Sequence, residues 1–270
     1  MDSAQTDAYL DRLGAERPAR PTADALRTLH LRHLETVPFE NLSIHLGEEI
    51  VLTEERLLGK VLGTRRGGFC YELNGAFAAL LTTLGFEVTL LAARVHTPGG
   101  GLGIPFDHLA LLVRTVDGGE WLADIGFGGL SNGPLAWRER GDQVDDAGVF
   151  RLVDVAGTGG DVDVVKDGTP QYRLETRPRA LGDFVAGAWW HRTSPESHFT
   201  RSLVCSRLTE DGGRVTLSGR KVKVTGVDGA VSEVRELGDD AEVLAAYRDR
   251  FGIELARVPQ VRGTENGGRE

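Results

Sequence analysis

Apolar residues recur every three or four positions through the first 86 residues, which is the spacing that places them on one face of a helix. The predicted helices cover 7–13, 23–35, a segment that follows Thr53, and about 70–84. Thr6 and Thr22 are candidate N-caps, and Gly14 and Gly85 are candidate C-caps. Residues 37–42 are expected to be extended, because a proline at position 38 disfavours helix in the residue before it.

Beyond Phe86 the pattern changes to short runs of aliphatic, β-branched and aromatic residues, which are typical of strands. The strand candidates are 88–95, 106–116, 121–125, 150–155, 162–165, 172–175, 202–207, 214–218, 222–225 and 231–235, the last four as an antiparallel meander. We also expect a short helix over 180–190 and a final helix capped by Asp239 or Asp240. The polar, Gly-rich end beyond Val261 is expected to be flexible.

Composition and charge narrow the class of protein. The chain has 270 residues with a formal net charge of −9, and 40% of the residues are apolar. A chain of this length can bury a core without disulfide bonds, and its acidic balance argues against nucleic acid or an anionic membrane as a partner. The N-terminus lacks the apolar core of a signal peptide, and no apolar run approaches the roughly 20 residues of a spanning helix. We therefore expect a soluble, cytoplasmic protein.

Cys70 is the first residue with distinctive chemistry. It and Cys205 are too few for a disulfide framework or a four-thiolate zinc site, and the histidines show no metal-ligand spacing. Cys70 follows Gly67 and Gly68 at the predicted start of a helix, where the positive end of the helix dipole stabilises a thiolate. This position suits a nucleophile. It also suits a buried apolar cysteine, and the pattern alone does not separate the two.

A cysteine nucleophile needs a base and a group that orients the base. His108 lies in a predicted strand, and Asp124 is a lone acid in the next one. Asp117-Gly118-Gly119 predicts a three-residue turn that pairs Leu112 with Asp124. His108 and Asp124 then share a face but lie about 13 Å apart, so contact needs a shifted turn or a bulge. Taken singly, His108 is better explained as a core histidine and Asp124 as a turn or cap carboxylate.

Five segments stand out in order along the chain. They are Pro38-Phe39-Glu40-Asn41-Leu42, Arg66-Gly67-Gly68-Phe69-Cys70-Tyr71-Glu72-Leu73-Asn74, His108, Asp124-Ile125-Gly126-Phe127-Gly128-Gly129 and Thr193-Ser194-Pro195-Glu196-Ser197-His198-Phe199. In order and spacing they resemble the motif set of the arylamine N-acetyltransferase family, over nearly the whole chain. Ile125, where valine is commoner, and the Ala123-Asp124 pair are small departures.

The resemblance implies an α+β fold with three parts. They are an N-terminal helical bundle at 1–86 that carries the nucleophile, a central antiparallel β-barrel at 87–190 that carries His and Asp, and a C-terminal α/β lid at 191–270. The core around the Cys-His-Asp triad is expected to be similar to that of papain-like proteases and transglutaminases.

The resemblance also implies an activity. Cys70 is the nucleophile, His108 the base and Asp124 the group that orients it. The reaction moves an acetyl group from acetyl-CoA to an arylamine, arylhydrazine or N-arylhydroxylamine through an acetyl-cysteine, in a ping-pong sequence. Acetyl-CoA is the implied cosubstrate and no metal is implied, while a homodimer stays open as the assembly state.

Further residues receive supporting roles from the same resemblance. Glu40, Asn41 and Arg66 resemble a structural cluster in which the arginine pairs with the glutamate near the cysteine turn. Candidate walls of an apolar aryl pocket are Phe39, Val95, Phe127 and Phe199, although ordinary core packing explains them equally. The Gly-rich stretches 99–103 and 126–129 would let the CoA pyrophosphate approach the backbone, and the N–H of Cys70 is a candidate for the oxyanion hole.

Three other functions are open from the sequence. A macrolactam-forming amide synthase of the same fold would use the same triad on a carrier-bound polyketide, and a composition rich in Gly, Ala, Arg and Asp suggests a GC-rich source in which such pathways occur. A cysteine peptidase or amidase is permitted by the triad alone. The third is a non-catalytic binding protein with a retired site.

Overall fold

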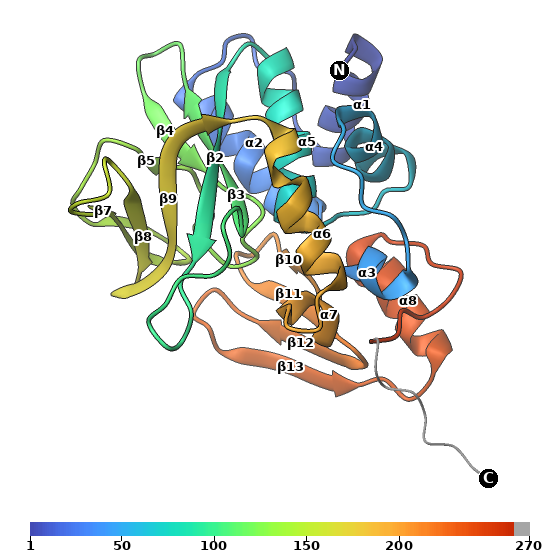
Figure 1. The fold of residues 1–270 in the computed structure, drawn as a ribbon. Coiled ribbons are helices and arrows are strands. Elements are labelled where there is room, and N and C mark those ends of the chain that lie inside the picture. Colours follow the sequence, from blue (N-terminus) through green and yellow to red (C-terminus); the bar gives the residue numbers. More distant parts are fainter. Residues whose placement is uncertain (262–270) are drawn as a thin grey trace.

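The N-terminal segment is helical, as its pattern predicts (Figure 1). Residues 1–261 are described by the computed structural model, so the flexible tail expected beyond Val261 lies outside the described residues. The elements of the segment are α1 Ser3–Leu13, α2 Ala23–Thr36, α3 Leu42–Leu46, α4 Glu54–Leu58, the π-helical turn η1 Gly59–Gly63 and α5 Cys70–Thr83. The sequence pattern did not predict α3, because five residues are too few to show a helical period.

The first two helices begin with different kinds of N-cap. α2 begins after Thr22, whose side chain accepts a backbone N–H of the first turn, as expected. α1 begins earlier than predicted, because Asp2 accepts the N–H of Gln5 and the side chain of Gln5 accepts the N–H of Asp2. This reciprocal capping box satisfies two backbone donors, so Thr6 lies inside the helix instead of capping it.

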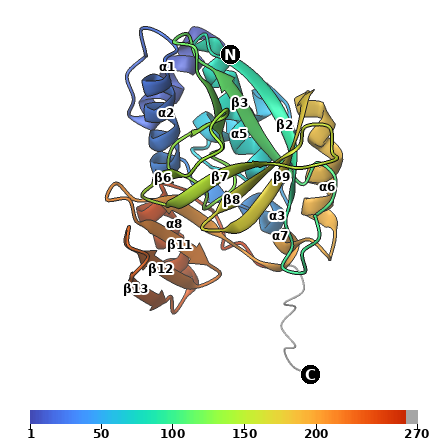
Figure 2. The same ribbon diagram turned by 90° about the vertical axis from the view of Figure 1, so that its left-hand side faces the viewer.

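The middle of the chain forms one eight-stranded antiparallel sheet that curls into a nearly closed barrel (Figure 2). The strand order is β5-β4-β3-β2-β9-β8-β7-β6. The strands are β2 Glu87–Val95, β3 His108–Arg114, β4 Glu120–Ala123, β5 Leu135–Ala136, β6 Gln143–Asp145, β7 Gly148–Asp154, β8 Val162–Lys166 and β9 Thr169–Arg179. The pattern missed β5 and β6, since two or three residues show no alternation, and it predicted only the middle of β9.

The middle of β2 and most of β3 are buried on both faces. Ala92 and Leu111 belong to the core that includes α5, whereas Leu91 and Ala110 belong to the core inside the barrel. This alternation has the period of two that is expected of a strand. His108 has the parity of Ala110, and its ring contacts aromatic side chains of the barrel core.

The β3–β4 hairpin has a longer turn than predicted. The turn spans Thr115–Gly119, so Leu112 faces Leu122 instead of Asp124. The predicted register was therefore wrong by two residues, a shift that keeps every side chain on its face. Extending the observed register places His108 two positions from the residue opposite Asp124, about 7 Å along the strand.

A second antiparallel sheet joins segments that are far apart in the sequence, in the order β1-β10-β11-β12-β13. Its strands are β1 Phe39–Glu40, β10 Cys205–Leu208, β11 Arg214–Ser218, β12 Lys221–Thr225 and β13 Val231–Glu236. Helix α8, Asp240–Phe251, is capped by Asp239 as expected, and its apolar residues pack with this sheet. The predicted meander is confirmed, and the extended segment around Pro38 contributes its edge strand β1.

Short helices connect the two sheets. They are the 3₁₀ turn η2 Leu181–Phe184, α6 Val185–Thr193 and α7 His198–Arg201. The single helix predicted over 180–190 is therefore split into η2 and α6, and α6 lies beside α5 and leads toward the C-terminal sheet (Figure 1). Within residues 1–261, no helix has both the length and the apolar character needed to cross a membrane.

Candidate active site

Cys70 is the first residue of α5 and is buried. The turn before it has no room for side chains, because a Cβ on Gly67 would lie 1.7 Å from a backbone oxygen of the segment before β1. A Cβ on Gly68 would lie 2.6 Å from the side chain of Glu72, which accepts the N–H of Phe69 at 3.2 Å. The two glycines thus permit a close approach that fixes the thiol at the positive end of α5.

His108 and Asp124 meet at the open end of the β3–β4 hairpin. His108 is the first residue of β3, Asp124 follows the last residue of β4, and His108 Nε2 lies 2.7 Å from Asp124 Oδ2. The side chains of Cys70 and His108 line the same cavity, and their interaction contributes to the raised pKa of His108. Because Nε2 faces the carboxylate, Nδ1 is the nitrogen left for the thiol. The structure brings the three sequence-predicted side chains together in the order thiol, imidazole, carboxylate.

Asp124 is held by several donors besides His108. Asn74 Nδ2 at 2.9 Å and the Gly126 N–H at 3.0 Å donate to Oδ1, and the Tyr172 hydroxyl at 2.9 Å donates to Oδ2. Sequence reasoning did not find Asn74 or Tyr172 as partners of Asp124. Asn74 has a usable signal, since it lies one helical turn after the cysteine on the same face of α5. Tyr172 has none, because it lies on a strand 48 residues further along the chain.

The buried charges shift the pKa values of the pair in opposite directions. Burial alone would lower the pKa of His108, but the charge of Asp124, their hydrogen bond and the contact with Cys70 raise this pKa to about 10. Burial would raise the pKa of Asp124, but His108, Asn74 and the N–H of Gly126 hold it below its usual value. At neutral pH an imidazolium therefore lies beside a carboxylate, where it can stabilise a neighbouring thiolate.

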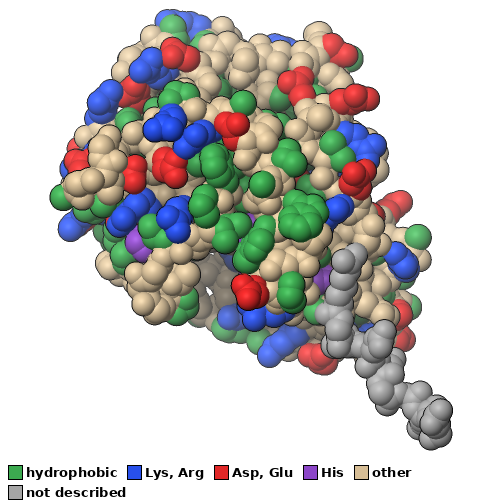
Figure 3. All heavy atoms as spheres, viewed as in Figure 1, with side chains coloured by type: hydrophobic (Ala, Val, Ile, Leu, Met, Phe, Trp, Pro, Cys, Tyr) green, Lys and Arg blue, Asp and Glu red, His purple; other side chains and the backbone are tan. Residues whose placement is uncertain are grey.

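A cavity of about 490 Å³ opens onto Cys70 and His108. Phe39, Val95, Phe127 and Phe199, the four predicted pocket residues, all line it. The unpredicted polar residues of its wall include His96, Asp107, His191 and His198. Figure 3 shows a hollow between the barrel and the C-terminal sheet on the face that carries α6. A cavity of this volume with largely apolar walls fits a small aromatic molecule.

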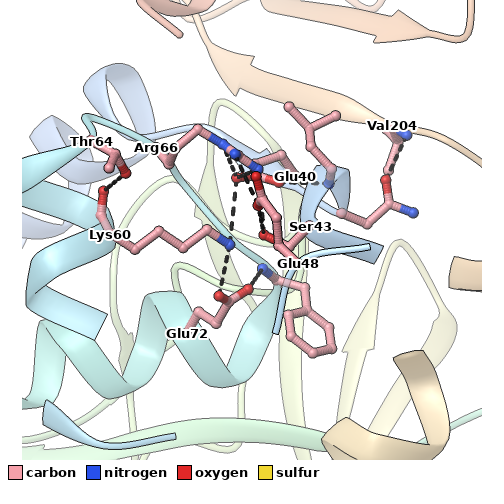
Figure 4. Close-up of polar contacts among 11 residues, drawn as sticks. Glu40, Ser43, Glu48, Lys60, Thr64, Arg66, Glu72 and Val204 are labelled. Atoms are coloured by element: carbon pink, nitrogen blue, oxygen red, sulfur yellow. Dashed lines mark hydrogen bonds and ion pairs between the residues drawn. The ribbon is translucent and has the colours of Figure 1, made fainter. Parts of the chain in front are cut away.

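A buried network of charges lies behind the cysteine turn (Figure 4). Arg66 Nη2 lies 3.0 Å from Glu40 Oε1, which is the pair that the resemblance implies. Lys60 Nζ on η1 lies 2.7 Å from Glu72 Oε1 and 3.6 Å from Glu40 Oε1, and neither contact was predicted from the sequence pattern. Because Glu72 also accepts a backbone N–H beside Cys70, this network supports the turn that presents the thiol.

Asn41 makes its hydrogen bonds outside this charge network, with the segment that leads from α7 to β10. Its Nδ2 donates to the carbonyl oxygens of Ser202 at 2.6 Å and Phe199 at 3.0 Å, and its Oδ1 accepts the N–H of Val204 at 2.9 Å. Asn41 thus fastens the chain between α7 and β10 to the end of β1. It supports the cavity wall at Phe199, although the resemblance grouped it with Arg66.

The Gly-rich stretches differ in what surrounds them. A Cβ on Gly126 would lie 2.7 Å from the Cα of Cys70, so the backbone there abuts this residue. Gly99 and Gly100 have open space instead, whereas a Cβ on Gly103 would lie 1.9 Å from Oδ2 of Asp107. A larger cavity of about 1090 Å³ is lined by α4, η1 and Arg257 but not by Cys70 or His108. Residues 1–261 hold no group of three or more His, Cys, Asp or Glu side chains that could bind a metal.

These contacts define a class of protein. A cysteine in reach of an imidazole, which a buried carboxylate orients, is the arrangement of enzymes that form covalent intermediates on a thiol. The cavity beside the thiol provides room for a small substrate.

Comparisons with known proteins identify the family. A family model described as N-acetyltransferase matches residues 22–260. An arylamine N-acetyltransferase / N-hydroxyarylamine O-acetyltransferase of Salmonella typhimurium is 38% identical over 217 residues, 78% of this chain and 75% of its own. The arylamine N-acetyltransferase of Escherichia coli is 34% identical over 251 residues, 91% of this chain and 87% of its own. The chain belongs to the arylamine N-acetyltransferase family.

Solved structures agree with this assignment. The arylamine N-acetyltransferase structure from Salmonella typhimurium has a TM-score of 0.86 at 34% identity and covers 94% of this chain and 92% of its own. The Mycobacterium marinum enzyme in complex with CoA has a TM-score of 0.81 at 33% identity, covering 92% of each chain. These matches give no support to the macrolactam-forming amide synthase that the sequence left open.

Proposed function

We propose that this chain transfers an acetyl group from acetyl-CoA to an arylamine, arylhydrazine or N-arylhydroxylamine, with Cys70 as nucleophile, His108 as base and Asp124 as the orienting group. The observation that carries the proposal is a thiol within reach of an imidazole 2.7 Å from a buried carboxylate, with an apolar cavity open to both. The names of the relatives, and the CoA in the Mycobacterium marinum structure, support the classes of acceptor and donor.

In the first half-reaction, the thiolate of Cys70 attacks the carbonyl carbon of the acetyl thioester. The N–H groups of Glu72 and Leu73 bond the carbonyl oxygen of Phe69, so the N–H of Cys70, which precedes them at the start of α5, is the one suited to hold the negative charge that develops on the carbonyl oxygen. The carbon–sulfur bond to CoA then breaks, and the leaving thiolate takes the proton of the His108 imidazolium. Acetyl-Cys70 and a neutral imidazole result.

In the second half-reaction, the acceptor nitrogen or hydroxyl oxygen attacks the acetyl-cysteine and gives its proton to His108. The carbon–sulfur bond to Cys70 breaks, and the thiolate and imidazolium are restored. Asp124 accepts the N–H of His108 throughout, so it keeps the ring oriented and stabilises its positive charge. A thioester intermediate suits this transfer, because it is close in energy to acetyl-CoA and an amine can attack it.

Three parts of the chain are assigned roles in this function. We propose that 1–86 carries the nucleophile, that 87–190 carries the base and the carboxylate in a core similar to papain-like proteases and transglutaminases, and that 191–270 is a lid. Phe199 and His198 line the cavity, which supports a covering role for the third part. We further propose a cytoplasmic location, with no nucleic acid or membrane as partner. The chain is a monomer or a homodimer, and analytical sedimentation would decide between the two.

Thiol release from acetyl-CoA with a panel of aryl amines tests the proposed function. Cys70→Ser, His108→Gln and Asp124→Asn are each expected to abolish turnover in a folded protein. Wild-type activity in Cys70→Ser would refute the assignment. Acetate release without an amine, at a rate equal to transfer, would favour a hydrolase instead.

A further inference from the structure

The residues next to the nucleophile and the base are joined to each other. Tyr71 follows Cys70 on α5, and its hydroxyl donates to the carbonyl oxygens of Phe106 at 2.7 Å and Asp107 at 3.0 Å. These are the two residues that precede His108. One buried hydroxyl thus connects the backbone beside the thiol with the backbone beside the imidazole, across two elements of the fold.

The backbone held by this hydroxyl is strained. Phe106 has a φ of 59°, a value in the left-handed region that non-glycine residues rarely adopt. Such a conformation persists only where surrounding contacts enforce it, and it is commonly found at functional sites. Gly187 on α6 makes room for the contact, because a Cβ there would lie 2.7 Å from the carbonyl oxygen of Phe106 and 2.9 Å from the Tyr71 hydroxyl.

A second histidine–aspartate pair fixes the same backbone from the other side. His191 Nε2 on α6 lies 2.9 Å from Asp107 Oδ1, and Asp107 Oδ2 accepts the N–H of Val95 at 3.1 Å. His191 Nδ1 lies 3.2 Å from Ser197 Oγ. The pair therefore ties the residue before His108 to β2 and α6. Both ring nitrogens of His191 are engaged within the protein, so this ring is placed to hold structure and not to take a proton from a substrate.

We propose that Tyr71, Asp107 and His191 form a positioning brace that sets the distance between the Cys70 thiol and the His108 ring. The proposal rests on the proposed roles of Cys70 and His108. Burial, with the nearby charges of Cys70 and Asp107, raises the pKa of Tyr71, so its hydroxyl remains a donor over the working pH range. Loss of the brace leaves every reacting group present but misaligned, and a misplacement of about 1 Å can cost about 100-fold in rate.

The first test compares two tyrosines that are equally buried. Tyr71→Phe removes the brace hydroxyl, whereas Tyr9→Phe removes one that lies 2.9 Å from His33 Nε2 in the helical segment. Alkylation of Cys70 by iodoacetamide across pH reports on the thiolate–imidazolium pair without acetyl transfer. We expect Tyr71→Phe to slow alkylation at neutral pH and to lower kcat, each by about tenfold or more, with an unchanged KM for acetyl-CoA. Tyr9→Phe is expected to keep both rates.

His191 provides the second comparison. His191→Gln keeps an amide N–H that can donate to Asp107, whereas His191→Leu does not, so glutamine is expected to retain more of the alkylation rate. Equal rates in these two variants, or a Tyr71→Phe protein that alkylates as fast as wild type over the whole pH range, would overturn the proposal. If Tyr71→Phe does not fold, the His191 pair decides. A chain that alkylates as expected but transfers no acetyl group would refute the proposed function and leave the brace standing.

Discussion

Nε2 of His108 lies 2.7 Å from Oδ2 of Asp124, although the two residues are not paired across the hairpin that carries them. The contact is diagonal, because the turn at Thr115–Gly119 brings Asp124 closer to the start of β3. Asn74 from α5 and Tyr172 from β9 hold the carboxylate in this position. A helix, a hairpin and a distant strand thus fix one carboxylate, and that carboxylate fixes the ring.

Replacing Asp124 by asparagine keeps the shape of the side chain and removes its charge. The amide can turn its N–H toward Nε2, which favours the wrong tautomer of His108, and the imidazolium loses its partner. We expect kcat to fall by about 10⁴-fold, as in other triads that lose this charge, while the variant still folds. Steady-state thiol release and thermal unfolding measure the two effects. A fall of less than about tenfold would contradict the role of Asp124.

Stability is expected to depend on pH through His108. Its pKa rises from 6.5 to about 10 on folding, so the folded chain binds this proton more tightly. The resulting stability is fully present below pH 6.5 and is lost toward pH 10, by about 1.4 kcal/mol per pH unit between the two values. Asp124 acts in the opposite sense, because its lowered pKa gives stability that is lost as the pH falls through the folded value.

Urea unfolding of the wild type and His108→Gln at several pH values tests this expectation. The difference in unfolding free energy between the two proteins should shrink as the pH rises from 6.5 toward 10. A difference that stays constant over this range would show that the ring does not gain a proton on folding.

Gly126 is expected to be sensitive to the smallest substitution. In Gly126→Ala the new Cβ would lie 2.7 Å from both the Cα of Cys70 and Nδ2 of Asn74, so the backbone must move away from the thiol. We expect kcat to fall by about 100-fold, because this backbone positions Cys70 and Asp124, the proposed nucleophile and orienting group. Gly133→Ala is the matched control, since nothing lies within 4 Å of a Cβ there. Equal kinetics in the two variants would contradict this account.

The Arg66–Glu40 pair is expected to matter for stability. Arg66→Met leaves the carboxylate of Glu40 buried without the guanidinium that hydrogen-bonds to it, which costs about 3–5 kcal/mol. Arg17→Met breaks an exposed pair with Asp7 and is expected to cost less than about 1 kcal/mol. Urea denaturation gives both values. Similar losses in the two variants would show that Lys60 compensates for Arg66.

The site was predictable where chemistry depends on local pattern. The glycines before Cys70 and the helical period after it locate a thiol at a helix start, and the period of two puts His108 and Asp124 on one face. Their contact was not predictable from the pattern, because a turn of three residues and a turn of five fit the same Asp117-Gly118-Gly119 signal. The resemblance to the family's motifs predicted that His108 pairs with Asp124, which the predicted strand register did not.

Contacts between elements that are distant in the sequence were not predicted from the pattern. Lys60 and Tyr172 reach the site from a π-helical turn and a late strand, and no local pattern indicates where such side chains end. Asp2 and Thr6 are both suitable N-caps for α1. The capping box at Asp2 forms in the structure, so the helix begins earlier than the prediction from Thr6. The domain boundaries at residues 86 and 190 stay predictions, and so does the cytoplasmic location, because neither the structure nor the comparisons test them.

The covalent intermediate is the most direct test of the central claim. The protein would be mixed with acetyl-CoA without an amine, quenched in acid, digested and analysed by mass spectrometry. The account predicts one acetyl group on the peptide that contains Cys70, lost when an aryl amine is added before the quench and absent in Cys70→Ser. An unmodified Cys70 peptide in a protein that still acetylates the amine would contradict it.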